Sequence, residues 1–282
     1  MVHDTIPILK TRSYLKSPQL PYIRIPGFQE IKNNDIVVFN WPADTVRKFF
    51  VKEKGVIKPR DKKSNYVKRA IGIPGDSLEI KDGVIYLNGQ ENKLPDRAKP
   101  LFKFKIYSKG GISSNKLKNL EIDGFIRKFV IRNLSQESFN ILNDNILSIS
   151  NTNENEYLIY TNDEGIPINK VRELSLDIRE IIDNEKELSL TFDDANKIRN
   201  SNEFDTIFRL VDKLNVNNSI FFPGNRRFNW NNDQLGPIYI PKTGDKINLT
   251  ISNLPLYKKI IKDYENNKIE IIENKIYIND KL

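Results

Sequence analysis

The sequence contains no cysteine, one histidine and one methionine among its 282 residues. Without cysteine it can form no disulfide, present no thiol nucleophile and build no cysteine zinc site, and we expect no metal and no other cofactor. The single histidine, His3, lies near the start of the chain, where we expect a solvent-exposed residue rather than a catalytic base. If the protein is a hydrolase, its base is therefore a lysine or a carboxylate.

Long apolar runs are also missing. No run reaches the roughly 18 apolar residues that a membrane-spanning helix needs, and residues 1–7 lack the basic start and apolar centre of a signal peptide. Lysine and arginine (45 together) outnumber aspartate and glutamate (37), a formal net charge of +8. A basic balance favours nucleic acid or an anionic membrane face as a partner. We attribute the positive net charge to a general enrichment in lysine, because no basic cluster is long enough for a nucleic-acid-binding arm.

What remains is the composition of a globular protein, with 38% hydrophobic and 10% aromatic residues. The length allows one large domain or two modest ones. We predict a mainly β fold with a mostly antiparallel β core over residues 1–114 and an inserted α+β subdomain over residues 115–218. An aromatic loop, a helix and a final hairpin over residues 219–282 are predicted to return to the core.

Local patterns predict the individual elements. A buried strand is expected at residues 36–41, where Pro42 stops it, and an Asp-Gly turn at residues 82–83 predicts a hairpin. Further strands are predicted at residues 46–51, 65–71, 77–80, 84–87, 102–107 and 238–240. Helices are predicted to begin near Thr191, a capping residue, and after Asn253, with Pro255 in the first turn.

Two patterns near the end of the chain add to this organisation. A helical stripe predicts core packing rather than a membrane face, and it comprises Leu256, Tyr257, Ile260, Ile261 and Tyr264. Residues 268–279 echo residues 77–88, since both show apolar alternation, a polar turn and then Ile-Tyr-hydrophobe-Asn. This is a weak two-copy repeat rather than a solenoid.

The most informative segment is Asn-Tyr-Val-Lys-Arg-Ala-Ile-Gly-Ile-Pro-Gly-Asp at residues 65–76. Strand alternation puts Tyr66, Lys68 and Ala70 on one face and Arg69 on the other, where we expect Arg69 to pair with a carboxylate. Desolvation disfavours the charged form of an amine, so a lysine held against apolar neighbours can act as a general base. Judged by residue types alone, a strand lysine is more often structural.

This segment resembles the lysine box of the type I signal peptidases, which reads roughly Tyr-hydrophobe-Lys-Arg-x-hydrophobe-Gly-hydrophobe-Pro-Gly-Asp. The matching residues are Tyr66, Val67, Lys68, Arg69, Ile71, Gly72, Ile73, Pro74, Gly75 and Asp76. Residues 34–39 are similar to the family's preceding Gly-Asp-hydrophobe-Val-hydrophobe-Phe box. Other segments look like the Bacteroidetes branch of the family, which carries a long insertion, and these are residues 19–28, 61–66, 230–233 and 236–241.

The resemblance implies a serine endopeptidase with a Ser–Lys pair that removes signal peptides from exported preproteins after small residues. It implies a catalytic domain on the outer, periplasmic face of the cell membrane. Lys68 matches the general base that takes the proton of the serine nucleophile. Asn65, Tyr66 and Val67 match the edge of the site, where the backbone pairs with the extended substrate and side chains border small-residue pockets.

Two other family motifs have no match. The family's nucleophile lies in a Ser-Met-x-Pro-Thr box that follows one or more membrane helices, and its last box reads Gly-Asp-Asn-Arg-x-x-Ser-x-Asp-Ser-Arg. Gly224-Asn225-Arg226 lacks the aspartate and the continuation, so we assign it to the insertion. We therefore expect the middle of a signal peptidase, with the membrane segment elsewhere.

Two alternatives stay open. The first is a non-catalytic remnant or split half that binds extended peptides or a partner chain. The second, ranked well behind, is a basic nucleic-acid-binding protein, and no nucleic-acid partner is expected.

Overall fold

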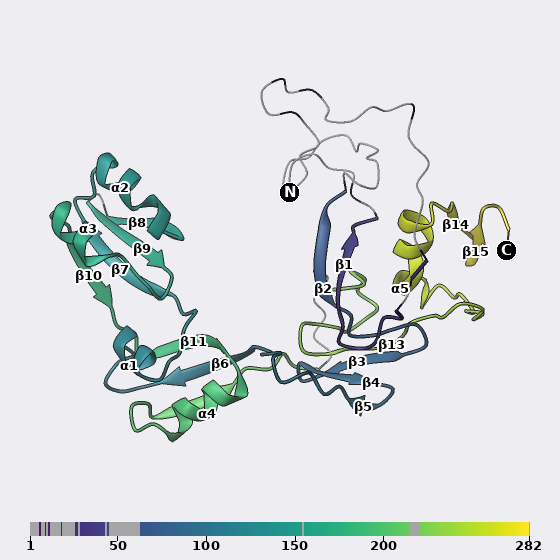
Figure 1. The fold of residues 1–282 in the computed structure, drawn as a ribbon, viewed down its shortest axis with the longest axis horizontal. Coiled ribbons are helices and arrows are strands. Elements are labelled where there is room, and N and C mark those ends of the chain that lie inside the picture. Colours follow the sequence, from purple (N-terminus) through teal and green to yellow (C-terminus); the bar gives the residue numbers. More distant parts are fainter. Residues whose placement is uncertain are drawn as a thin grey trace. The chain divides into compact units, whose positions relative to one another are not determined.

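The computed structural model describes residues 29–42, 44, 63–153, 155–214 and 220–281, with the single positions 6, 9, 11, 18, 26 and 27. Fifteen strands in five antiparallel sheets dominate these residues (Figure 1), which confirms the mainly β, antiparallel prediction. The strand predicted at residues 46–51 lies outside the described residues. The chain forms two compact units, residues 1–95 with 212–282, and residues 96–211. The second unit is thus inserted in the sequence of the first, and its bounds differ from the predicted 115–218.

In its described residues, the first unit contains three small sheets and one α-helix. Strand β1 pairs with β2, a four-stranded sheet has the order β13-β3-β4-β5, and β14 pairs with β15. The bounds are β1 Ile36–Asn40, β2 Asn65–Arg69, β3 Ser77–Lys81, β4 Val84–Leu87, β5 Gln90–Glu91, β13 Leu235–Tyr239, α5 Leu254–Lys259, β14 Ile269–Ile272 and β15 Lys275–Ile278.

The predicted hairpin at residues 77–87 is present as β3 and β4. Its turn residues Asp82 and Gly83 both have positive φ, 50° and 72°, as a two-residue primed turn requires. The second hairpin, β14–β15, repeats this turn with positive φ at Glu273 and Asn274. The similarity of the two segments in sequence therefore extends to their backbone conformation.

An asparagine closes each hairpin in the same way. In the first hairpin the Asn88 side-chain oxygen accepts the Ser77 N–H at 2.9 Å, and the Asn88 N–H donates to the Ser77 carbonyl. In the second, Asn279 accepts the Lys268 N–H at 2.9 Å and donates to the Lys268 carbonyl. These bonds satisfy the backbone groups where each hairpin opens, so the repeat is a repeat of hydrogen bonding as well.

Helix α5 begins at Leu254 after Asn253, with a proline in its first turn, as predicted. Leu254 is buried, but Ile260 and Tyr264 are 44% and 41% exposed. The prediction of a continuous core stripe is therefore wrong at these two residues. The helix continues from Ile260 to Tyr264 in π geometry, and its wider turn moves later residues away from the i, i+4 line.

The second unit consists of two antiparallel sheets with short helices. One sheet has the order β10-β7-β9-β8 and the other β11-β6-β12. The bounds are β6 Phe102–Tyr107, α1 Ser114–Asn119, β7 Arg127–Arg132, α2 Gln136–Leu142, η2 Asn143–Asn145, β8 Ser148–Asn153, β9 Glu156–Thr161, α3 Ile168–Glu173, β10 Asp177–Ile181, β11 Glu185–Leu190, α4 Phe192–Asn200 and β12 Thr206–Arg209.

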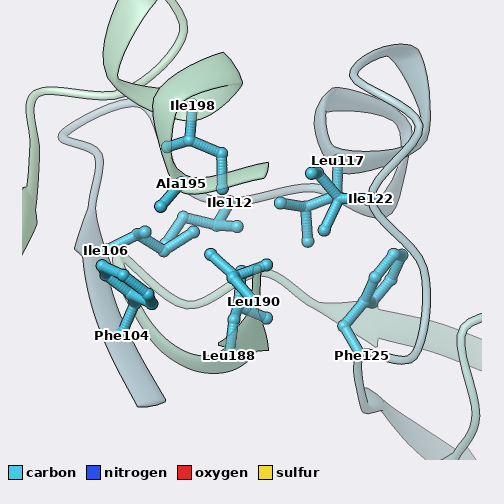
Figure 2. Close-up of a cluster of buried hydrophobic side chains, with 10 residues drawn as sticks. All are labelled: Phe104, Ile106, Ile112, Leu117, Ile122, Phe125, Leu188, Leu190, Ala195 and Ile198. Atoms are coloured by element: carbon cyan, nitrogen blue, oxygen red, sulfur yellow. The ribbon is translucent and has the colours of Figure 1, made fainter. Parts of the chain in front are cut away.

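Figure 2 shows the larger hydrophobic cluster of this unit, in which side chains of β6, β11, α1 and α4 converge. In the register of β6 and β11, Phe104 lies opposite Leu188 and Phe102 lies opposite Leu190. Helix α4 is capped by Thr191, whose hydroxyl accepts the Asp194 N–H at 3.1 Å, so the predicted helix start is confirmed.

Burial differs between the units. Among the described residues, every buried apolar side chain except Leu254 belongs to the second unit. Residues 36–40 form the predicted strand, but Ile36 and Val38 are 66% and 67% exposed, so the expectation of a buried strand is wrong. The physical reason is that, among the strands given by the structure, β1 pairs only with β2, and a two-stranded sheet buries little unless another layer covers it.

Candidate functional site

Strand β2 carries the lysine box and pairs with β1 in antiparallel register. Lys68 lies opposite Val37, and Tyr66 lies opposite Phe39. The Tyr66 ring stacks on Phe39 at 6.2 Å between centroids and meets the edge of Trp41 at 5.2 Å. These aromatic contacts fix the face of β2 on which Lys68 also lies.

Lys68 itself is exposed. Within the described part of the chain its ammonium makes no hydrogen bond and no ion pair. The apolar enclosure expected around Lys68 is therefore not present among the described residues, where the two-stranded sheet has no covering layer on this face. The structure places Lys68 on strand β2, as the sequence predicts.

The other predicted site residues lie on the same strand. Asn65 is exposed and its side-chain oxygen accepts the Asn40 amide at 2.6 Å, while Val67 is 61% exposed on the opposite face from Tyr66 and Lys68. β2 has one neighbour, β1, among the strands that the structure describes. The unpaired edge of β2 is a place where an extended peptide can add as a strand.

Arg69 does not pair with a carboxylate in the described chain, which corrects the sequence prediction. Its guanidinium donates to the Asn34 carbonyl at 2.6 Å. The Asn34 N–H in turn donates to the Ala70 carbonyl, and Ala70 donates to Asp35. Asn34 has positive φ, and this conformation, which directs its carbonyl toward Arg69, could not be predicted from a local sequence pattern. Arg69 stabilises this turn.

A buried carboxylate that the sequence did not reveal holds the start of β2. Asp44 is 6% exposed and accepts both the backbone N–H and the hydroxyl of Ser64, at 2.8 and 2.9 Å. The Trp41 N–H donates to the Ser64 carbonyl at 2.9 Å. Ser64, the serine next to the lysine box, is thus engaged with Asp44 and contributes to the frame of the site.

The turn after the lysine strand is organised by Asp76. Its carboxylate accepts the Ile73 N–H at 2.9 Å and the side-chain amides of Asn33 and Asn88 at 2.7 and 2.9 Å. The Ile73 N–H, followed by the two amides, holds the pKa of Asp76 below its usual value. Charge-assisted hydrogen bonds of this kind are stronger than neutral ones, so Asp76 connects the lysine box to two other segments.

Replacing Asp76 with asparagine is expected to lower the free energy of unfolding by about 1–2 kcal/mol at pH 7. Because folding lowers the pKa, the contribution is present above the unfolded value of about 3.9 and is lost as pH falls through the folded value. Chemical denaturation of both proteins from pH 7 to pH 3 should show a difference that shrinks at acid pH. A difference independent of pH would contradict the role given to the charge.

The second unit contains a Ser–Lys contact of a different kind. The Lys116 ammonium lies 3.4 Å from the Ser108 hydroxyl and also donates to the Gly111 and Glu203 carbonyls. Ser108 is 3% exposed, and its hydroxyl donates to the Glu203 carbonyl at 3.2 Å. A lysine that donates to several oxygen acceptors serves as a cation, so this pair closes a loop rather than forming a catalytic dyad.

Desolvation of a lysine does occur, at Lys186 in the second unit. Burial lowers the pKa of Lys186. Its ammonium donates to the Ile126 carbonyl at 2.9 Å and lies 5.3 Å from the centre of the Phe125 ring. Both contacts favour the charged form and hold Lys186 as a structural donor.

Comparison with known proteins gives the same family that the lysine box indicates. A family model described as "Signal peptidase, peptidase S26" matches residues 4–146. Signal peptidase I P of Bacillus subtilis subsp. natto is 42% identical over 40 residues, 14% of this chain and 22% of that protein. Signal peptidase IB of Staphylococcus aureus is 44% identical over 45 residues, 15% of this chain and 24% of that protein.

The chain thus spans about a quarter of the length of the curated relatives it matches. No solved structure matches it. Within the described residues, no helix combines the length and the apolar character needed to cross a bilayer. The family match covers half of the sequence and includes the whole strand–turn segment around Lys68, and the chain belongs to the signal peptidase family, peptidase S26.

Proposed function

We propose that this chain is the lysine-bearing part of a type I signal peptidase that removes signal peptides from exported preproteins. The observation that carries the proposal is the lysine box, which the structure holds as strand β2 followed by the Asp76-centred turn. The family match over residues 4–146 supports it. The nucleophilic serine belongs, in this proposal, to a segment with the Ser-Met-x-Pro-Thr box, which this sequence does not match.

Lys68 acts as the general base in the proposed reaction. Its neutral amine accepts the proton of the serine hydroxyl as the oxygen attacks the scissile carbonyl. The Lys68 ammonium then gives this proton to the peptide nitrogen, which leaves as an amine while the acyl-enzyme forms. Water then attacks the ester, and the released carboxylate is the end of the signal peptide. Burial of an amine favours its neutral form, so the substrate and the serine-bearing segment have to cover the exposed face of Lys68.

The substrate is proposed to bind as an added strand. An extended peptide pairs its backbone with the free edge of β2, and Asn65, Tyr66 and Val67 border the pockets for its small side chains. The exposure of Asn65 and Val67 is compatible with this role. We place the reaction on the outer face of the cell membrane.

The test is intact-mass analysis and terminal sequencing of the native gene product, followed by a cleavage assay on a preprotein. The expected product carries the serine box upstream of Lys68 and cleaves the preprotein after a small residue. If the native polypeptide contains the serine box and still leaves the preprotein intact, the proposed activity is wrong.

The alternative is a chain that binds extended peptides without cutting them. The exposed, unbonded Lys68 and the free edge of β2 in the described structure favour it. A signal peptide that binds the native polypeptide, while no product forms even after the missing serine segment is supplied, would support this alternative.

A further inference from the structure

A hollow beside helix α5 in the first unit is not explained by the proposed cleavage reaction. It has a volume of about 620 Å³. We call it the α5 hollow. Its lining includes Arg227, Lys258, Lys259, Lys262, Asp263 and Ile271.

The charge of the α5 hollow is strongly unbalanced. Four cationic side chains, Arg227, Lys258, Lys259 and Lys262, line it together with one carboxylate, that of Asp263. None of the four cations has a carboxylate within ion-pair distance in the part of the chain that the structure describes. Like charges gathered without counterions repel one another, and an anion bound between them relieves this repulsion.

Two of the cations are held in place by contacts that leave their charge uncompensated. The Arg227 guanidinium donates to the Ile251 carbonyl at 3.3 Å. The Lys259 ammonium lies 5.8 Å from the centre of the Trp41 ring. Neither contact supplies a full negative charge, so both side chains remain available to a phosphate or carboxylate group.

An exposed apolar side chain lies beside these cations. Ile271 of β14 lines the hollow and is 52% exposed. A soluble anion uses the cations alone, whereas an amphiphile with an anionic head and an apolar tail matches both features.

We propose that the α5 hollow binds the phosphate headgroup of an anionic phospholipid, with Ile271 against the start of the acyl chains. Lysine and arginine close to an anionic lipid surface are attracted to it, and their stems lie well along apolar groups. The proposal is independent of Lys68, because it requires neither the serine nor the cleavage reaction.

The test measures co-sedimentation of the chain with vesicles of phosphatidylcholine, with and without phosphatidylglycerol. We expect binding only when phosphatidylglycerol is present, and a loss of about tenfold or more in the double variant Lys258→Glu/Lys262→Glu. The matched control is Lys103→Glu/Lys118→Glu, which changes the net charge equally at two exposed lysines of the second unit. The control should bind within about threefold of the unchanged protein.

Equal losses in both double variants would overturn the proposal, because binding would then follow net charge and not the hollow. Equal binding to phosphatidylcholine alone would overturn the role of the headgroup charge. If charge reversal unfolds the chain, the pair Lys258→Gln/Lys262→Gln and Lys103→Gln/Lys118→Gln provides the same comparison.

A second arm separates lipid from free phosphate. Ile271→Ser should weaken vesicle binding severalfold but leave any thermal stabilisation by inorganic phosphate unchanged. If inorganic phosphate stabilises the protein but the protein binds no vesicle, the lipid assignment is overturned, and the hollow is a site for a soluble anion.

Discussion

Lys68→Ala is expected to lower kcat/KM for preprotein cleavage by about 10,000-fold or more, because removal of the base leaves the serine hydroxyl protonated. The stability of the fold should change by less than about 0.5 kcal/mol, since an exposed side chain without hydrogen bonds contributes little. The comparison is made in the native gene product, with cleavage kinetics and thermal unfolding measured on the same preparation.

Two variants control this experiment. Lys68→Arg keeps a positive charge but cannot accept a proton, so it should be as inactive as Lys68→Ala. Lys275→Ala removes another exposed strand lysine and should retain full activity. An active Lys68→Ala enzyme would exclude Lys68 as the base and with it the Ser–Lys mechanism.

Gly236→Ala is expected to lower the free energy of unfolding by about 2–4 kcal/mol. Gly236 has a φ of +95°, and an added Cβ would lie 2.6 Å from the Leu78 carbonyl oxygen of β3. The Leu78 oxygen belongs to the backbone of β3, which pairs with β13, so it cannot move without disturbing this sheet. Chemical denaturation followed by circular dichroism measures the loss.

Gly244→Ala is the matched control. Gly244 has a φ of +91°, and nothing lies within 4 Å of its added Cβ. Its substitution has the conformational cost alone, about 1 kcal/mol. The difference between the two variants in free energy of unfolding therefore measures the effect of the close packing of β13 on β3. Equal losses of stability would contradict this close packing.

This close approach concerns the candidate site because β13 also binds the turn of the lysine box. Ile240, which follows β13, accepts the Gly75 N–H at 2.7 Å and donates to the Asp76 carbonyl at 2.8 Å. Nearby, Gln234 donates to the Asp82 carboxylate at 2.7 Å. A segment more than 150 residues away in sequence thus holds the lysine box in place.

Several elements could be predicted because their signals are local. The Asp82–Gly83 turn, the Thr191 cap and the start of α5 each depend on the conformational preference of a few neighbouring residues. The lysine strand followed from apolar alternation and its closing turn. In these places the short-range preference and the tertiary structure agree.

The predictions that were wrong concern tertiary contacts, that is, which other parts of the chain pack on a residue or bond to it. Alternation predicted that 36–41 is a strand but could not show whether another layer packs on it, and Ile36 is exposed. The pattern around Lys68 suggested an apolar enclosure, whereas the structure places the desolvated lysine at Lys186. Arg69 donates to the Asn34 carbonyl, whose direction results from the positive φ of Asn34.

By itself the sequence determined the family, the mainly β fold and the local hairpins. Those properties reside in short runs of residues, in which side-chain type and spacing specify the backbone. Only the tertiary structure decided the exposure of Lys68, the attachment of β13 to the lysine box and the gathering of Arg227 with the lysines of α5. These depend on contacts between residues distant in the chain, whose geometry no local pattern contains.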